Sequence, residues 1–281
     1  MGQTLASLGA ADPRLAPSGK HEFRLGRQFA AYKKKDAPPT RVKPIPIQVI
    51  KHTLTLAQAA PSVDNLAVAN MILIAFFFLM RPGEHTVSKE NTPFKLKDVQ
   101  FHVGQERHNA ASIPLNLLAA TSFVTYTYDT QKNAVRNEAI GLGRSGQGGC
   151  CPVEATVQRV RHLRQHDATP DTPLGTYYLP NGRSKTVTSD NITTTLRFSL
   201  QHFGTTLGLI PSEISARSLR AAGAMALLCA HVDHDTIRLI GRWRSDEMLH
   251  YLHAQAQPVM HDFARRMVHG GNYTMIPNNT I

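Results

Sequence analysis

Residues Leu66–Glu84 read LAVANMILIAFFFLMRPGE, and this stretch contains the longest strongly apolar run of the chain, Met71–Met80. A bilayer span needs roughly 20 apolar residues, so this shorter run predicts a buried core helix rather than a membrane span. The residue before a proline disfavours the α conformation, and we therefore expect the helix Leu66–Met80 to end at Arg81-Pro82. That ending places an arginine at the edge of the core.

The rest of the chain combines a few strand patterns with several helix patterns. Strands are predicted over Asp98–Val103, Ser122–Tyr128 and Glu138–Leu142, the second of them rich in β-branched and aromatic residues. Helices are predicted over Pro152–Gln165, Ser189–Leu207, Ala216–Ala230, Asp233–Ile240, a segment capped by Ser245, and Pro258–Val268. The expected fold class is α+β, mainly α, with a small antiparallel β-sheet.

The composition favours a polyanionic partner. The 281 residues include 31 Lys and Arg against 20 Asp and Glu, a formal charge of +11, and such a surplus is typical of proteins that bind nucleic acid. The three cysteines are odd in number and two are adjacent, which indicates a reducing compartment rather than a disulfide framework. The N-terminus has no secretory pattern, so we expect a nuclear location in a eukaryote and a cytoplasmic one otherwise.

The positive charge is concentrated near the N-terminus, where residues 1–55 hold ten Lys and Arg against three acidic residues. Prolines make the basic stretch extended rather than helical. We expect a basic arm or linker at residues 1–41, a folded domain at 42–268 and a flexible tail at 269–281; a merely solvated tail explains the arm equally well. The candidate DNA contacts are Lys33, Lys34, Lys35, Arg41, Lys43, Arg242 and Arg244.

Two motifs suggest other ligands but lack the required context. Gly141–Gly146 matches G-x-G-x-x-G, yet the next helix begins only near Pro152, whereas a dinucleotide site needs the glycines to open a helix. Cys150 and Cys151 are adjacent and therefore chelate one zinc ion poorly, and no C-x-x-C motif occurs. We expect neither a metal nor a cofactor.

The basic residues with the clearest chemical meaning fall in ordered positions. Arg81 follows the apolar helix, and Lys132 lies in the turn after the predicted strand Ser122–Tyr128. Arg217 and Arg220 are three residues apart at the start of an Ala-rich helix, where we expect them to share one face and to favour an anion between them. Further on, Gly241-Arg-Trp243 precedes Tyr251, and Trp243 is the only tryptophan.

This order resembles the tyrosine recombinases, the phage-integrase type of DNA breaking and rejoining enzyme. The matching motifs are Arg81-x-x-Glu84, Lys132 in a β-turn, Arg217-x-x-Arg220, and Gly241-x-Trp243 with Tyr251. The wording ISARSLRAAGAMALL and GRWRSDEMLHYL looks most like integrases of eukaryotic mobile elements of the Crypton type, and the resemblance covers roughly residues 42–267. Only a remnant of the family's N-terminal DNA-clamping domain fits into residues 1–41, so the resemblance implies that this domain is truncated here.

The resemblance implies a function on double-stranded DNA without metal or ATP. Tyr251 is then the nucleophile that forms a 3′-phosphotyrosine, and Lys132 protonates the leaving 5′-oxygen. Family members act as tetramers on two duplexes, which implies a homo-oligomer and no membrane partner. A type IB topoisomerase, which uses the same covalent step without pairing two sites, is an alternative.

The resemblance also assigns residues that bind the reacting phosphate. Arg81 and Arg220 clamp it, Trp243 packs against it and donates its indole N–H, and Glu84 orients Arg81 or the neighbours of the lysine. Arginine suits this role independently, because its guanidinium makes bidentate contacts to phosphate oxygens. Taken singly, each residue also fits an ordinary role such as a helix-end cap, a solvated turn lysine or a packed aromatic.

One position departs from the family pattern. Most members carry a histidine where this chain has Arg217, and a guanidinium cannot accept the proton of the tyrosine. Arg217 could instead lower the pKa of Tyr251 by its charge, or His250 or His253 could act as the base. An inactive, DNA-binding relic of a mobile-element integrase is therefore the main alternative function.

Overall fold

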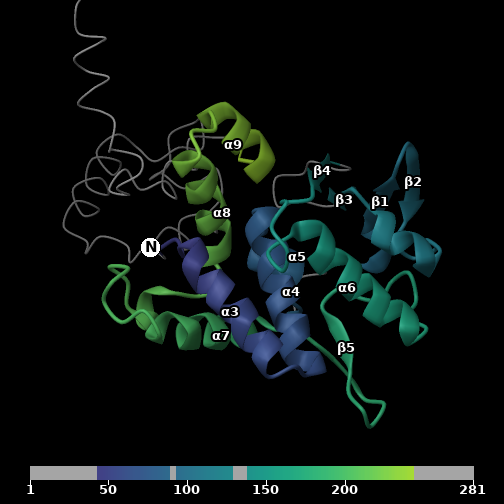
Figure 1. Cartoon of the computed structure of the whole chain (residues 1–281), viewed down its shortest axis with the longest axis horizontal. Helices are drawn as coiled ribbons and strands as arrows, with labels where there is room; N and C mark the ends of the chain where they lie inside the picture. The colour runs from purple at the N-terminus through teal and green to yellow at the C-terminus, as the bar shows by residue number, and fades with distance from the viewer. Residues whose placement is uncertain (1–42, 89–92, 129–137, 244–281) are drawn as a thin grey trace, which may run out of the picture. The chain divides into compact units, whose positions relative to one another are not determined.

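The computed structural model describes residues 43–88, 93–128 and 138–243, and Figure 1 labels its elements. The α-helices are α3 (Ile47–Ala59), α4 (Val63–Phe77), α5 (Pro82–His85), α6 (Pro152–Gln165), α7 (Ser189–Gln201), α8 (Ser218–Cys229) and α9 (His234–Gly241). The strands are β1 (Val99–Val103), β2 (Glu106–Asn109), β3 (Phe123–Tyr128), β4 (Glu138–Gly143), β5 (Thr176–Tyr178) and β6 (Ser184–Thr186). The expected fold class, α+β with mostly helices and a small antiparallel sheet, is confirmed.

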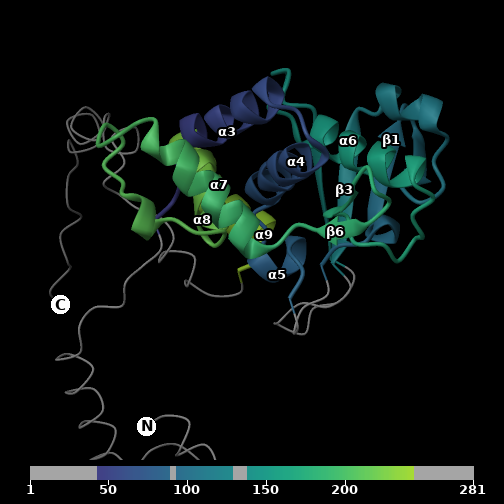
Figure 2. The same cartoon turned by 90° about the horizontal axis from the view of Figure 1, so that it is seen from below.

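The helices and the larger sheet occupy different sides of the described domain. In Figures 1 and 2, α3, α7, α8 and α9 gather on one side, β1–β4 lie on the other, and α4 and α6 run between them. None of the helices in residues 43–243 that the structure describes is long and apolar enough to cross a membrane. The expected arm and tail and the two helices predicted from Ser245 onward lie outside the described residues.

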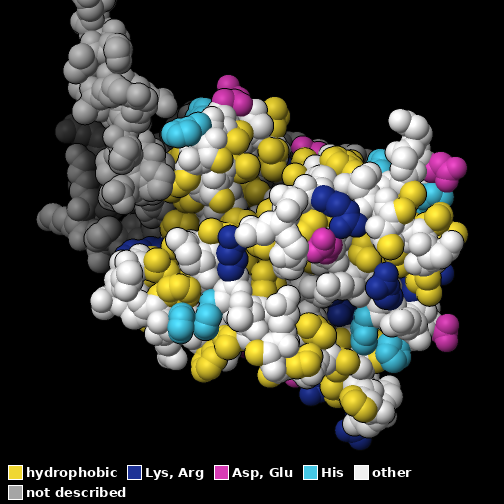
Figure 3. Space-filling model, in the orientation of Figure 1, with side chains coloured by type: hydrophobic (Ala, Val, Ile, Leu, Met, Phe, Trp, Pro, Cys, Tyr) yellow, Lys and Arg dark blue, Asp and Glu magenta, His cyan; other side chains and the backbone are white. Residues whose placement is uncertain are grey.

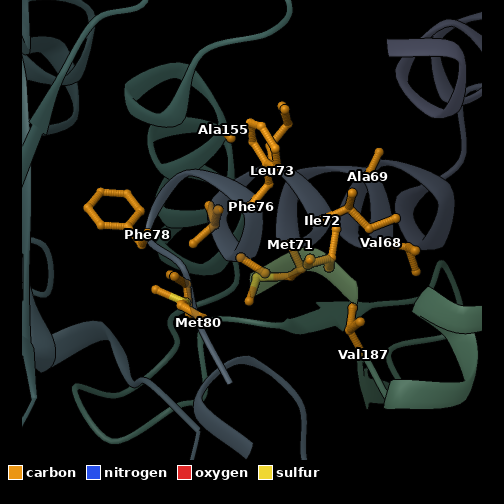
Figure 4. Packing of buried hydrophobic residues seen from close by; sticks show 14 of the residues in the cluster. Val68, Ala69, Met71, Ile72, Leu73, Phe76, Phe78, Met80, Ala155 and Val187 are labelled. Atoms are coloured by element: carbon orange, nitrogen blue, oxygen red, sulfur yellow. The ribbon is translucent and has the colours of Figure 1, made fainter. Parts of the chain in front are cut away.

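Helix α4 is the centre of the core. Ser62 caps it by accepting a hydrogen bond from the Asn65 backbone N–H at 3.3 Å, which satisfies one of the open donors of the first turn. The ten residues Ala67–Phe76 are all buried, because α3, α6, α7 and α8 surround the helix. Figure 4 shows its side chains leaving in several directions, toward Ala155 on one side and Val187 on another. A helix that is apolar all round is buried all round.

The end of α4 differs from the expectation. The helix stops at Phe77 and not at Arg81, because Leu79 adopts the left-handed conformation with φ 49°. This conformation is uncommon for a residue with a branched side chain. Leu79 is nevertheless buried and packs with Trp243 in a small second cluster, so tertiary packing holds a turn that local preference opposes. Pro82 then opens α5 and leaves Arg81 extended in front of it.

The sheet has the order β2-β1-β3-β4 with all neighbours antiparallel. Along β3, Val124, Tyr126 and Tyr128 are buried and alternate with more exposed residues, as expected for a strand with one covered face. Helix α6 packs on this strand, and the Tyr126 hydroxyl lies 2.9 Å from Thr156 Oγ1. The connection between β3 and β4, which contains Lys132, lies outside the described residues.

Helix α8 packs against α4 at a position that only glycine allows. A Cβ at Gly223 would lie 2.3 Å from the Phe76 carbonyl oxygen, so the two backbones are in direct contact. This contact fixes α8, which carries Arg220 one turn earlier. Helix α9 follows and ends at Gly241, after which Arg242 takes the left-handed conformation with φ 58°.

Candidate active site

Arg81 is held by Glu84. The Glu84 carboxylate accepts the Arg81 backbone N–H at 2.7 Å and the Arg81 Nη1 at 3.0 Å, which ties both the main chain and the side chain to the first turn of α5. The proline between them supports this turn, because proline is favoured at the first helical position. The Arg81 side chain keeps 27% of its surface exposed, so its guanidinium is oriented and still accessible.

Arg242 is the second partner of Glu84. Its Nη2 donates to Glu84 Oε2 at 2.8 Å, and its guanidinium also donates to the carbonyls of Phe78 at 3.2 Å and Leu79 at 3.3 Å. The same group lies 3.8 Å from the centre of the Tyr128 ring, a cation–π distance. Only 1% of the side chain is exposed. Arg242, a candidate DNA contact from the sequence, is therefore a buried side chain in this structure.

Arg220 and Trp243 form the other half of the site. Arg220 is buried on α8, donates to the Gly241 carbonyl, and places its guanidinium 4.3 Å from the centre of the Trp243 ring. Trp243 is buried against Leu79 and neighbouring residues of α8 and α9. Arg220 and Trp243, which the resemblance assigns separately to the phosphate, thus contact each other in the structure, and the arginine lies on the indole ring.

The two halves meet at Tyr128, which the sequence analysis did not single out. Burial raises the pKa of the Tyr128 hydroxyl far above its usual value, and Arg242, Glu84, Arg220 and Arg81 all act on it electrostatically. Arg242 lies on the Tyr128 ring and pairs with Glu84, which also pairs with Arg81. Arg220 contacts Gly241 and Trp243, the two residues that flank Arg242 in the chain. Three arginines and one carboxylate give this neighbourhood a net positive charge, which suits a phosphate.

Tyr128 could have been found from the sequence. It ends the predicted strand on the same face as Tyr126, and period-two alternation puts both on the buried side. The pattern does not reveal that its ring lies against Arg242, the residue that follows α9.

Arg217 and Arg220 do not share one environment. Arg217 is the residue before α8 and is exposed, whereas Arg220 is buried. Arg217 nevertheless has helical backbone angles, φ -65° and ψ -24°, so the two residues keep the helical spacing and differ in burial. Its guanidinium is open to solvent or to a ligand from outside.

Several expected site residues lie outside the described residues; they are Lys33, Lys34, Lys35, Arg41, Lys132, Arg244 and Tyr251. Lys43, the described member of the expected basic arm, forms an ion pair with Glu213 at 2.8 Å. On the face shown in Figure 3, the Lys and Arg side chains of the described residues are scattered over the surface and not gathered into one patch.

No protein-family model matches the chain, and no curated protein sequence matches it. Among solved structures, the XerH site-specific recombinase bound to its difH substrate has a TM-score of 0.49 at 14% identity, over 95% of this chain and 69% of that one. The XerA recombinase has a TM-score of 0.46 at 13% identity, over 98% of this chain and 82% of that one. The Tn1549 transposon integrase in complex with transposon right end DNA has a TM-score of 0.41 at 12% identity, over 82% of this chain and 67% of that one.

The structures to which this chain is similar are recombinases and integrases, the class that the ordered motifs of its sequence resemble.

Proposed function

We propose that this chain is a DNA strand-transfer enzyme of the tyrosine-recombinase kind, which cleaves and rejoins double-stranded DNA through a 3′-phosphotyrosine without metal or ATP. Arg81 and Arg220 bind the reacting phosphate, and Trp243 packs beside it. Tyr251 is the nucleophile and Lys132 the general acid.

The observation that carries this proposal is the convergence of Arg81, Glu84, Arg220 and Trp243 from three distant stretches of sequence. Arg81 is fixed by Glu84, and Arg220 by the Gly241 carbonyl and the Trp243 ring. Preorganised arginines of this kind stabilise the extra negative charge that develops on phosphorus in the transition state. They also bind the ground-state diester through bidentate contacts.

The proposed step conserves the phosphodiester. The Tyr251 oxygen attacks phosphorus while the bond from phosphorus to the 5′-oxygen breaks, and Lys132 gives its proton to that oxygen. A 5′-hydroxyl of another strand then reverses the step and releases the tyrosine, so no external energy source is needed. The proton of Tyr251 needs an acceptor other than Arg217, whose guanidinium stays charged; His250 and His253 beside the tyrosine are the candidates.

A covalent trapping assay tests the proposal. The probe is a pool of nicked duplexes of randomised sequence, labelled on the strand that stays attached after cleavage, so that the short fragment diffuses away and the adduct accumulates. We expect a labelled protein band that resists denaturing detergent for the natural chain and no band for Tyr251→Phe. Arg220→Lys should bind duplex DNA but form no adduct, because lysine keeps the charge and loses the bidentate geometry. An equal band from Tyr251→Phe would contradict the assignment of the nucleophile.

A DNA-binding relic is the second candidate, and the exposed Arg217 in the place of the family's histidine favours it. Binding of duplex DNA by the natural chain, with no adduct in the trapping assay, would support this candidate over the enzyme. Relaxation of a supercoiled plasmid without recombined products would instead indicate topoisomerase-like activity.

A further inference from the structure

We propose that Arg242 is a positioning residue, which orients the Arg81 guanidinium through Glu84. It also couples Arg81 to Arg220, the two arginines that bind the phosphate. The inference rests on the proposed function, because it assigns a role at the same site. It gives a different role to a side chain that the sequence suggested as a DNA contact.

The two oxygens of the Glu84 carboxylate have different partners. Oε1 accepts from Arg81 Nη1 at 3.0 Å, while Oε2 accepts from Arg242 Nη2 at 2.8 Å and from the Arg81 backbone N–H. Arg242 thereby holds one oxygen away from the Arg81 guanidinium. If Arg242 were absent, Oε2 would keep only the Arg81 backbone N–H, and the carboxylate would lose the charged donor that balances the Arg81 guanidinium. The whole negative charge of Glu84 would then act on Arg81 and compete with a phosphate for it.

Arg242 also binds the backbone that leads into Arg81. Its guanidinium donates to the carbonyls of Phe78 and Leu79 and lies on the Tyr128 ring. One planar group therefore fixes the turn before Arg81 and the carboxylate after it. A lysine could replace the charge but not this fork of donors or the stacked contact.

The two neighbours of Arg242 in the chain both contact Arg220. Gly241 gives its carbonyl to Arg220, and Trp243 lies under the Arg220 guanidinium. Gly241 and Trp243 thus hold Arg220, while Arg242 between them holds Glu84, the partner of Arg81. The chain continues from these three residues to Tyr251. A displacement of Arg242 would disturb Arg81 and Arg220 together.

Burial of an arginine does not by itself make it a positioning residue for the phosphate site. Arg159 is a matched control for this point. Arg159 is also buried and donates to backbone carbonyls, those of Leu174 and Thr176. It has no described ion pair with a carboxylate and belongs to the packing between α6 and β5. A lysine at position 159 should therefore cost stability without changing the phosphate site.

Trp243 makes the test possible without a known target sequence, because the only tryptophan of the chain lies against Arg220. The probe is inorganic orthovanadate, a phosphate analogue, titrated against the full chain while the tryptophan emission is followed. We expect a saturable change for the natural chain, and binding about tenfold weaker for Arg242→Lys, since a charge-assisted hydrogen bond is worth about that factor. Arg159→Lys should bind as the natural chain does. A urea titration of each variant confirms that the folded protein is being compared.

A double-variant cycle separates positioning from general damage. If Arg242 acts in part through Glu84, then the loss of orthovanadate binding in the double variant Glu84→Gln with Arg242→Lys should be clearly smaller than the sum of the two single losses, because a shared route makes the losses non-additive. Unchanged binding by Arg242→Lys, or additive losses in the cycle, would overturn the inference and leave the phosphate site standing. No saturable response from the natural chain would overturn the phosphate site itself, and the inference with it.

Discussion

The substitution Gly241→Ala tests how tightly the Trp243 side of the site is packed. A Cβ at position 241 would lie 1.6 Å from Cζ3 and 2.0 Å from Cε3 of the Trp243 ring, whereas carbon atoms in contact are about 3.5–4.0 Å apart. The ring must therefore move by roughly 2 Å, or the backbone must shift.

The loss in the free energy of unfolding depends on whether the backbone or the indole ring moves. If the backbone relaxes, overpacking of this kind lowers the free energy of unfolding by about 1–3 kcal/mol. If the indole leaves its pocket beside Leu79, Ala224 and Ile237, the loss approaches the ~3–5 kcal/mol of a truncated core tryptophan. In both cases the indole no longer lies correctly under Arg220, so the emission of Trp243 should change.

Urea denaturation and the emission maximum of Trp243 measure these two effects on the same samples. A suitable control is Gly148→Ala, because a Cβ there meets nothing within 4 Å; its stability should stay within about 0.5 kcal/mol of the natural chain, as for most surface changes. If Gly241→Ala matched this control in both stability and emission, the close contact between Gly241 and Trp243 would be refuted.

Three further predictions concern the surroundings of the site. Gly223→Ala should lower the free energy of unfolding by about 1–3 kcal/mol in urea titrations, because its Cβ would meet the Phe76 carbonyl and push α8 off α4; stability equal to that of Gly148→Ala would count against it. Burial lowers the pKa of His85 from 6.5 to about 4, so the unfolded chain binds the proton first. The contribution of His85 to stability is complete above about pH 6.5 and is lost as the pH falls toward 4. The urea midpoint should accordingly fall less on acidification for His85→Gln than for the natural chain, and parallel pH profiles would contradict this. Affinity for random duplex DNA in a fluorescence-anisotropy titration should fall steeply with salt, since bound phosphates release counterions, whereas a flat response would argue against the arginine cluster as a DNA contact.

Much of the secondary structure could be predicted because its signals are local. Helix α6 spans Pro152–Gln165 as expected, since the proline marks its first turn and the apolar spacing fixes its face. The strand β3 was readable from its β-branched and aromatic run. The hairpin β5–β6 was missed, because each of its strands has only three residues and too little alternation to detect. The early end of α4 was also missed, because buried contacts of Leu79 decide it.

The sequence by itself identified candidate phosphate ligands, because the order of Arg81, Arg220 and Trp243 and the chemistry of each side chain can be read without the fold. Only the tertiary structure decided that Arg242 faces Glu84, a partner 158 residues away, instead of the solvent. The physical reason is that an arginine is mostly exposed unless partners satisfy its charge and its donors, and the local sequence does not show whether such partners are present. The choice depends on whether a carboxylate, free carbonyls and an aromatic ring arrive at the same place from other parts of the chain.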